Sequence, residues 1–261
     1  MAQPAGVTIS FTEAQGFTVL GNFLQSICAP SPLPIVRQIG NTAPGVNSRV
    51  PEPAGGDFIV MSSLSQPRLA TNLTTYSDVI FTGSVAVNVL TVTAVAQGTI
   101  EIGSLFLDGN YPPVVLPGSM ITGQLTGSPG GIGTYSVSGV QTVSSGTLYA
   151  GIRTDVATAE WIVQLNIHGP NSANNTRTID TLFRSDYAVD YFTAQGQPLA
   201  PLYCDDPRQA TWENAEQQME FDWTIDLHME IDVAIGTPQQ FADVVTVRVT
   251  DASTLRRFSL R

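Results

Sequence analysis

The chain has 261 residues, of which 43% are hydrophobic and 13% charged, with a formal net charge of −11 and no lysine. This length is sufficient for one large domain or two small ones. Sequence-specific nucleic-acid binding is not expected because it requires clustered cations. An acidic wall could still let DNA slide past with only transient contact.

The two cysteines, Cys28 and Cys204, form no CxxC pair and predict neither a zinc site nor a disulfide framework. We interpret them as buried thiols of a protein that folds in a reducing cytoplasm. The N-terminus lacks the pattern of a signal peptide, and no apolar run approaches the ~20 residues of a membrane span. We therefore expect no membrane partner, and folding and assembly inside a cell.

The first predicted element is a helix over Glu13–Ile27, preceded by a capping box formed by Thr12 and Gln15. Prolines after this helix favour a short extended stretch over Pro34–Ile39. A turn-like segment follows, and Asp57–Ala70 begins with a buried strand at its Phe-Ile-Val-Met sequence.

The composition changes over Ala86–Gly151, which contains only two charged residues, Glu101 and Asp108. Short β-type runs there are separated by turn signals at 108–110 and 128–131. We predict an inserted β-sandwich or barrel at residues 86–152, within a discontinuous α+β domain of residues 1–85 and 153–261. The predicted strands of the insert are Val89–Val95, Thr99–Leu105, Met120–Leu125, Gly133–Val137 and Thr147–Ala150.

After this segment, the alternation from Trp161 to Ile167 predicts a half-buried strand, and Asn171–Arg184 can form a helix. Tyr187–Trp212 is rich in turn residues and aromatics and is predicted to be a loop. Its aromatic side chains are interpreted as core beneath that loop rather than as a sugar site.

Sixteen residues of unbroken apolar–polar alternation, Gln218–Val233, predict one long strand. A turn at Gly236–Pro238 would pair its end with Phe241–Thr250 as a projecting hairpin arm. One compact domain rarely covers the apolar face of so long a strand along its whole length. We therefore expect the distal apolar residues of the strand to lie at a contact between subunits. These candidate hairpin residues are Met229, Ile231 and Val233.

The polar face of the long strand carries five acids that could line the lumen of a ring or meet a neighbouring subunit. Their regular spacing is what any exposed strand produces, so we do not interpret them as a catalytic pair. The five are Glu220, Asp222, Asp226, Glu230 and Asp232.

No motif predicts catalysis, a cofactor or a metal. The histidines, His168 and His228, have no partners at a recognised metal-ligand spacing. There is no GxSxG nucleophile elbow, and Gly127–Gly133 lacks the lysine of a phosphate-binding loop. We therefore expect a protein that is not an enzyme.

Several motifs resemble the phage neck (tail) terminator family, over about Phe17–Val85 and Arg153–Asp251. The segment between them resembles Gly/Thr-rich β modules inserted in phage tail proteins. The motifs are Phe17–Leu24, Asn47–Pro53, Asp57–Met61, Gln164–Pro170, Ala200–Cys204 and Gln217–Trp223.

The resemblance implies an α+β protomer, with helices on one face of a mixed or antiparallel sheet, that forms a ring capping the tail tube. In long-tailed phages this ring is usually a hexamer. Its implied partners are copies of itself, tail tube and sheath proteins, head-completion proteins, and genomic DNA passing through without specific binding. The implied location is the neck of the virion.

Three alternatives stay open at the level of the sequence. The chain could be a collar or head-to-tail adaptor ring in the same virion. It could act as an adhesin or whisker-binding module through the inserted β domain. A carboxylate-based glycan hydrolase is the third possibility.

Overall fold

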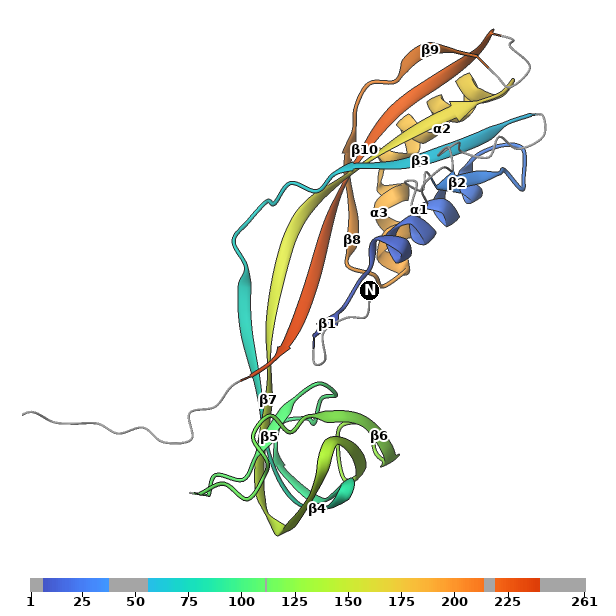
Figure 1. The fold of residues 1–261 in the computed structure, drawn as a ribbon. Coiled ribbons are helices and arrows are strands. Elements are labelled where there is room, and N and C mark those ends of the chain that lie inside the picture. Colours follow the sequence, from blue (N-terminus) through green and yellow to red (C-terminus); the bar gives the residue numbers. More distant parts are fainter. Residues whose placement is uncertain (1–6, 38–55, 111, 214–218, 240–261) are drawn as a thin grey trace, which may run out of the picture. The chain divides into compact units, whose positions relative to one another are not determined.

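The computed structural model describes residues 7–37, 56–110, 112–213 and 219–239, and no side chain is described within 211–221. It is an α+β protein with a mixed, mostly antiparallel sheet of ten strands and three helices (Figure 1). The sheet order is β1-β10-β7-β3-β2, with β4, β5 and β6 paired to β7, and β8 and β9 paired to β10. The predicted fold class is confirmed.

The chain divides into two compact units. The larger contains Thr8–Thr75 and Thr154–Gly236, and the smaller contains Tyr76–Arg153 with described residues 7 and 237–239. Three strands run without interruption from one unit into the other: β4 (Leu73–Gln97), β7 (Gly133–His168) and β10 (Met219–Pro238). That residues 86–152 form a separate inserted domain stays a prediction.

The larger unit is built on α1 (Glu13–Ile27), α2 (Ser172–Phe183) and α3 (Asp186–Ala194), which lie against one face of its strands (Figure 1). Its remaining strands are β1 (Thr8–Ile9), β2 (Ile35–Arg37), β3 (Phe58–Ser65), β8 (Leu199–Cys204), β9 (Arg208–Glu213) and β10 (Met219–Pro238). Strand β10 pairs antiparallel with β1, β8 and β9, and β3 pairs antiparallel with β7, whereas β2 and β3 are parallel.

The predicted capping box at the start of α1 is confirmed. Thr12 Oγ1 accepts a hydrogen bond from the Gln15 amide, and Gln15 Oε1 accepts one from the Thr12 amide at 2.7 Å. The helix then buries its apolar stripe, including Leu20, Phe23 and Leu24, against the sheet. Satisfying the free amides of the first turn lets the helix begin directly at Glu13.

Helix α1 lies very close to the sheet at Gly16, where an added Cβ would lie 2.6 Å from the buried ring of Trp161. At Gly21 in the same helix an added Cβ would meet only Met61, at an ordinary 3.7 Å. Both glycine-to-alanine changes gain similar helix propensity. The difference in stability between the two variants therefore measures the effect of the clash with Trp161.

We expect Gly21→Ala to stabilise the protein by up to ~1 kcal/mol. Gly16→Ala should be less stable than Gly21→Ala by ~1–3 kcal/mol because a tightly packed ring must move. Urea unfolding of the two variants measures this difference. Equal stabilities would contradict the packing of α1 on Trp161.

The smaller unit has its own core, which includes Phe81, Leu90, Ile121, Tyr135 and Leu148. Its other strands are β5 (Leu105–Leu107) and β6 (Ile121–Gly127), both antiparallel to β7. The turn signals at 108–110 and 128–131 do lie between strands, with Gly109 and Gly130 at positive φ.

Two predictions for this segment were wrong. Thr99–Leu105 is not a strand: only Leu105 is extended, and Gly98 and Gly103 adopt positive φ. The segments Gly133–Val137, Thr147–Ala150 and Trp161–Ile167 are not separate strands but parts of the 36-residue β7. The backbone stays extended because it changes partner along its length, from β6 to β5 to β3.

The predicted loop Tyr187–Trp212 was also wrong, because this region forms most of α3 and all of β8 and begins β9. Ser185 caps α3 by accepting a hydrogen bond from the Tyr187 amide. Strand β8 tolerates Pro201 because, among the strands that the structure describes, it pairs only with β10 and so lies at an edge of the sheet. The aromatic residues Tyr191 and Phe192 of α3 pack against Phe23 of α1.

The long strand predicted over Gln218–Val233 is confirmed as β10, but it does not turn at Gly236. It continues to Pro238, and Ile235 and Gly236 pair with β1. The predicted hairpin partner Phe241–Thr250 and the motif Asn47–Pro53 lie outside the described residues.

Candidate functional surface

The face of the sheet opposite the helices carries cross-strand polar pairs between β10 and β7. Side chains at even positions of β10 hydrogen-bond to side chains of β7 at 2.5–3.2 Å. We call this set the polar ladder: Thr224 with Asn166, Asp226 with Gln164, His228 with Glu160, and Asp232 with Thr158.

The five predicted acids differ in their surroundings. Asp222 and Asp226 are buried, Glu230 is half-buried and Asp232 is exposed. The side chain of Glu220 lies outside the described set, although its backbone pairs with Trp212 of β9. Of the four described acids, Glu230 and Asp232 are therefore the ones accessible from solvent.

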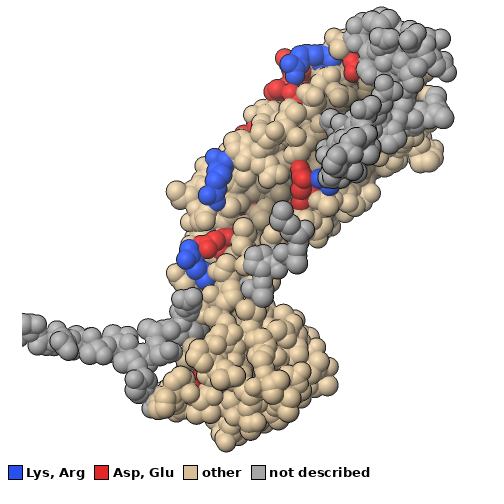
Figure 2. All heavy atoms as spheres, in the orientation of Figure 1, with Lys and Arg blue, Asp and Glu red and all other residues tan. Residues whose placement is uncertain are grey.

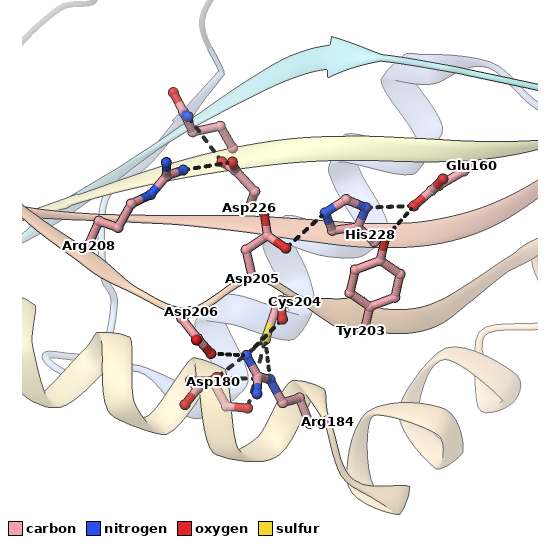
Figure 3. A network of polar contacts seen from close by, with 11 residues as sticks. Glu160, Asp180, Arg184, Tyr203, Cys204, Asp205, Asp206, Arg208, Asp226 and His228 are labelled. Carbon is pink, nitrogen blue, oxygen red and sulfur yellow. Dashed lines mark hydrogen bonds and ion pairs between the residues drawn. The ribbon is translucent and has the colours of Figure 1, made fainter.

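Asp226 is held from both sides. Its Oδ1 accepts a hydrogen bond from Gln164 at 3.0 Å, and its Oδ2 lies 3.1 Å from the guanidinium of Arg208 (Figure 3). Arg208 is mostly exposed, so this ion pair contributes little by itself. Both oxygens of the Asp226 carboxylate nevertheless have a hydrogen-bond partner in the same chain.

His228 lies at the centre of the ladder, and its side chain is 9% exposed. Its Nδ1 is 2.6 Å from Glu160 Oε1, and its Nε2 is 3.6 Å from Asp205 Oδ1 (Figure 3). The ring of Tyr203 stacks on the imidazole, with centroids 4.1 Å apart, and its hydroxyl donates to Glu160. Nε2 is buried and makes no hydrogen bond to any described residue.

These contacts change the acidity of the carboxyl group. The hydrogen bond from His228 lowers the pKa of Glu160 below its ordinary value of 4.5, and the Tyr203 hydroxyl adds to this effect against the opposing effect of burial. Glu160 is therefore ionised at neutral pH, and the adjacent Nδ1 carries the hydrogen that it donates.

A second cluster, on the helix side, ties α2 to the connection between β8 and β9. Arg184 at the end of α2 donates to the Cys204 carbonyl at 2.7 Å and lies 3.0 Å from Asp180 and 3.2 Å from Asp206 (Figure 3). Burial raises the pKa of the Cys204 thiol to about 11 and that of Cys28 to about 12. Both cysteines are free thiols, so they are neutral side chains at physiological pH.

The predicted hairpin residues lie in a different setting from the one expected. Met229 and Ile231 are 0% and 2% exposed and belong to the core of the larger unit, and Val233 packs against that core. The helices of the same chain supply this cover. These residues therefore need no neighbouring subunit to bury them. Their contact with another subunit stays a prediction.

Within the described residues, no group of three or more histidine, cysteine or acidic side chains is arranged to hold a metal ion. None of the helices there is long and apolar enough to span a membrane.

The ladder and the Arg184 cluster are pairs that fix strand register and loop position. The sequence did not identify Glu160 as part of this surface because its partner His228 is distant along the chain.

A family model described as phage neck terminator protein matches residues 106–253, which is more than half of the chain. The chain therefore belongs to the phage neck terminator family and is a structural component of the phage neck. The match includes residues 106–151 of the predicted insert and begins after the motifs at Phe17–Leu24 and Asp57–Met61. No curated protein matches the sequence.

Proposed function

We propose that this protein is a tail terminator that assembles as a closed ring at the head-proximal end of the tail. There it stops growth of the tail tube and sheath and binds the head-completion proteins. The observation that carries this proposal is the match of residues 106–253 to phage neck terminator proteins. A hexameric ring is the state that we expect.

The sheet of the larger unit offers edges for contact between subunits. Among the described strands, β8 and β9 pair only with β10, and β2 pairs only with β3. Unpaired backbone groups at such edges can pair with another chain. A heterologous contact of this kind must close into a ring to avoid open-ended assembly.

The accessible acids of the polar face are suited to the lumen of the ring. Glu230 and Asp232 project from the face opposite the helices, and repetition in every subunit would give a negatively charged wall that repels DNA. Asp226 is not suited to this role because Arg208 and Gln164 already bind its carboxylate.

Mass photometry of the purified chain, alone and with tail tubes, tests ring formation. We expect a hexameric mass, at the latest when tubes are present. A dodecameric mass would favour the adaptor alternative, and a chain that stays monomeric with tubes present would contradict the proposal.

The double variant Glu230→Lys/Asp232→Lys tests the position of the acidic residues. We expect rings that assemble but slow DNA ejection, because cations in the lumen attract phosphate. The matched control is Asp186→Lys/Asp190→Lys, which makes the same charge change at exposed sites on α3. Failure of only the first variant to assemble would place Glu230 and Asp232 in a subunit contact instead.

A further inference from the structure

The smaller unit contains a pocket of about 490 Å³ between the loop after β5 and the β7 segment Val143–Tyr149. Its size lies within the range of ~300–1,000 Å³ that is typical of small-molecule sites. Neither the fold nor the terminator role uses this pocket. All of its described lining residues belong to the smaller unit.

The loop side of the pocket is held in place by Asp108. This buried carboxylate accepts hydrogen bonds from the side chain and amide of Asn110 and from the amides of Val114 and Val115, at 2.7–3.3 Å. Burial alone would raise the pKa of Asp108, but these hydrogen bonds outweigh it and lower the pKa. Asp108 therefore positions the loop and offers no free carboxylate to a ligand.

The lining is otherwise uncharged and rich in hydroxyl groups. Ser144, Ser145 and Thr147 come from β7, Asn110 from the loop, and the half-buried Tyr149 adds an aromatic wall. Ser144, Ser145 and Thr147 are exposed. Hydroxyl groups can both donate and accept hydrogen bonds, so they suit a ligand that presents groups of both kinds.

The surrounding charge limits the class of ligand. Ala86–Gly151 contains no lysine or arginine, and the face of the smaller unit visible in Figure 2 is almost entirely uncharged. The segment therefore offers no cationic side chain to bind a phosphate or another anion. The carboxylate that lines the pocket, Asp108, already accepts hydrogen bonds from the loop and is not free to bind a cation. A polar lining also disfavours an apolar ligand.

From this lining we infer that the pocket binds a neutral saccharide. Such a ligand presents many hydroxyl groups to the serine and threonine side chains and an apolar ring face to Tyr149. This inference does not rest on the proposed terminator function. Saccharide binding and ring assembly can fail independently because they use different residues.

Gly146 allows the pocket to be filled without disturbing the backbone. A Cβ added at this position would have its nearest contact at 3.9 Å, and φ at Gly146 is not positive. Gly146→Trp should therefore occupy the pocket. Thr142→Trp is the matched control, because Thr142 is exposed in the same strand but does not line the pocket.

The test is saturation-transfer NMR on the full chain with maltotriose, cellotriose, mannotriose and N-acetylchitotriose at millimolar concentration. We expect at least one sugar to bind the wild type and Thr142→Trp, and to lose binding in Gly146→Trp. Absence of a signal from all four sugars with the wild type, or binding that persists in Gly146→Trp, would overturn the inference. If circular dichroism shows that Gly146→Trp is unfolded, Ser145→Ala/Thr147→Val replaces it, with affinity expected to fall about tenfold and unchanged affinity overturning the inference.

Discussion

Replacing Trp161 with alanine should destabilise the larger unit by ~3–5 kcal/mol, as is usual when a fully buried large aromatic residue is truncated. The side chain is 0% exposed. Its ring meets Phe17 edge to face at a centroid distance of 5.0 Å, and its indole nitrogen donates to Ser63 at 2.9 Å. Truncation removes these contacts and leaves a cavity under α1.

The control is Trp161→Phe, which retains an aromatic ring but loses the indole hydrogen bond and part of the volume. We expect it to cost less than half as much, because Ser63 is exposed and its hydroxyl can bond to water instead. Urea unfolding followed by tryptophan fluorescence measures both variants. The remaining tryptophans, Trp212 and Trp223, also belong to the larger unit, so the signal reports on that unit. A cost below ~1 kcal/mol for Trp161→Ala would contradict the close packing of this core.

The second large effect is expected at the pair of Glu160 and His228. Glu160→Gln should lower stability at neutral pH by ~2 kcal/mol. The variant has a neutral amide in place of the carboxylate that makes a charge-assisted hydrogen bond to a buried imidazole. Asp205→Asn is the matched control on the other ring nitrogen. Its carboxylate is 3.6 Å away and 52% exposed, so we expect almost no change.

This pair also predicts a pH dependence. The folded-state pKa of Glu160 is lower than its ordinary value of 4.5, so the unfolded chain binds more protons as the solution is acidified. Its contribution to stability is complete above pH 4.5 and is lost as the pH falls through the depressed folded value. Glu160→Gln should therefore flatten the acid side of the stability profile relative to the wild type, in urea titrations at a series of pH values. Parallel profiles for the two proteins would show that Glu160 is not ionised in a hydrogen bond with His228.

Patterns confined to one segment were sufficient to predict α1, α2, the start of β3 and the existence of the long strand β10, although not where β10 ends. A capping box and helical or alternating spacing depend on neighbours in the sequence, and Thr12 with Gln15 is such a local signal. The family resemblance was also carried by short motifs. The family match confirms the resemblance, and it covers Arg153–Asp251 but not Phe17–Val85.

Tertiary structure decided the features that depend on distant partners. Strand β7 is continuous because several strands, among them β6, β5 and β3 in turn, pair with it along its length, which overrides local signals such as Gly139 at positive φ. The burial of Met229 and Ile231 depends on helices that precede them in the sequence at long range, so alternation alone could identify the apolar face but not what covers it. In the same way, the sequence by itself determined that β10 carries a row of acids, whereas only the folded sheet decided that Asp226 is paired with Arg208 and that Asp232 remains exposed. Charge is a property of each residue, but its screening and pairing are properties of the groups that folding brings beside it.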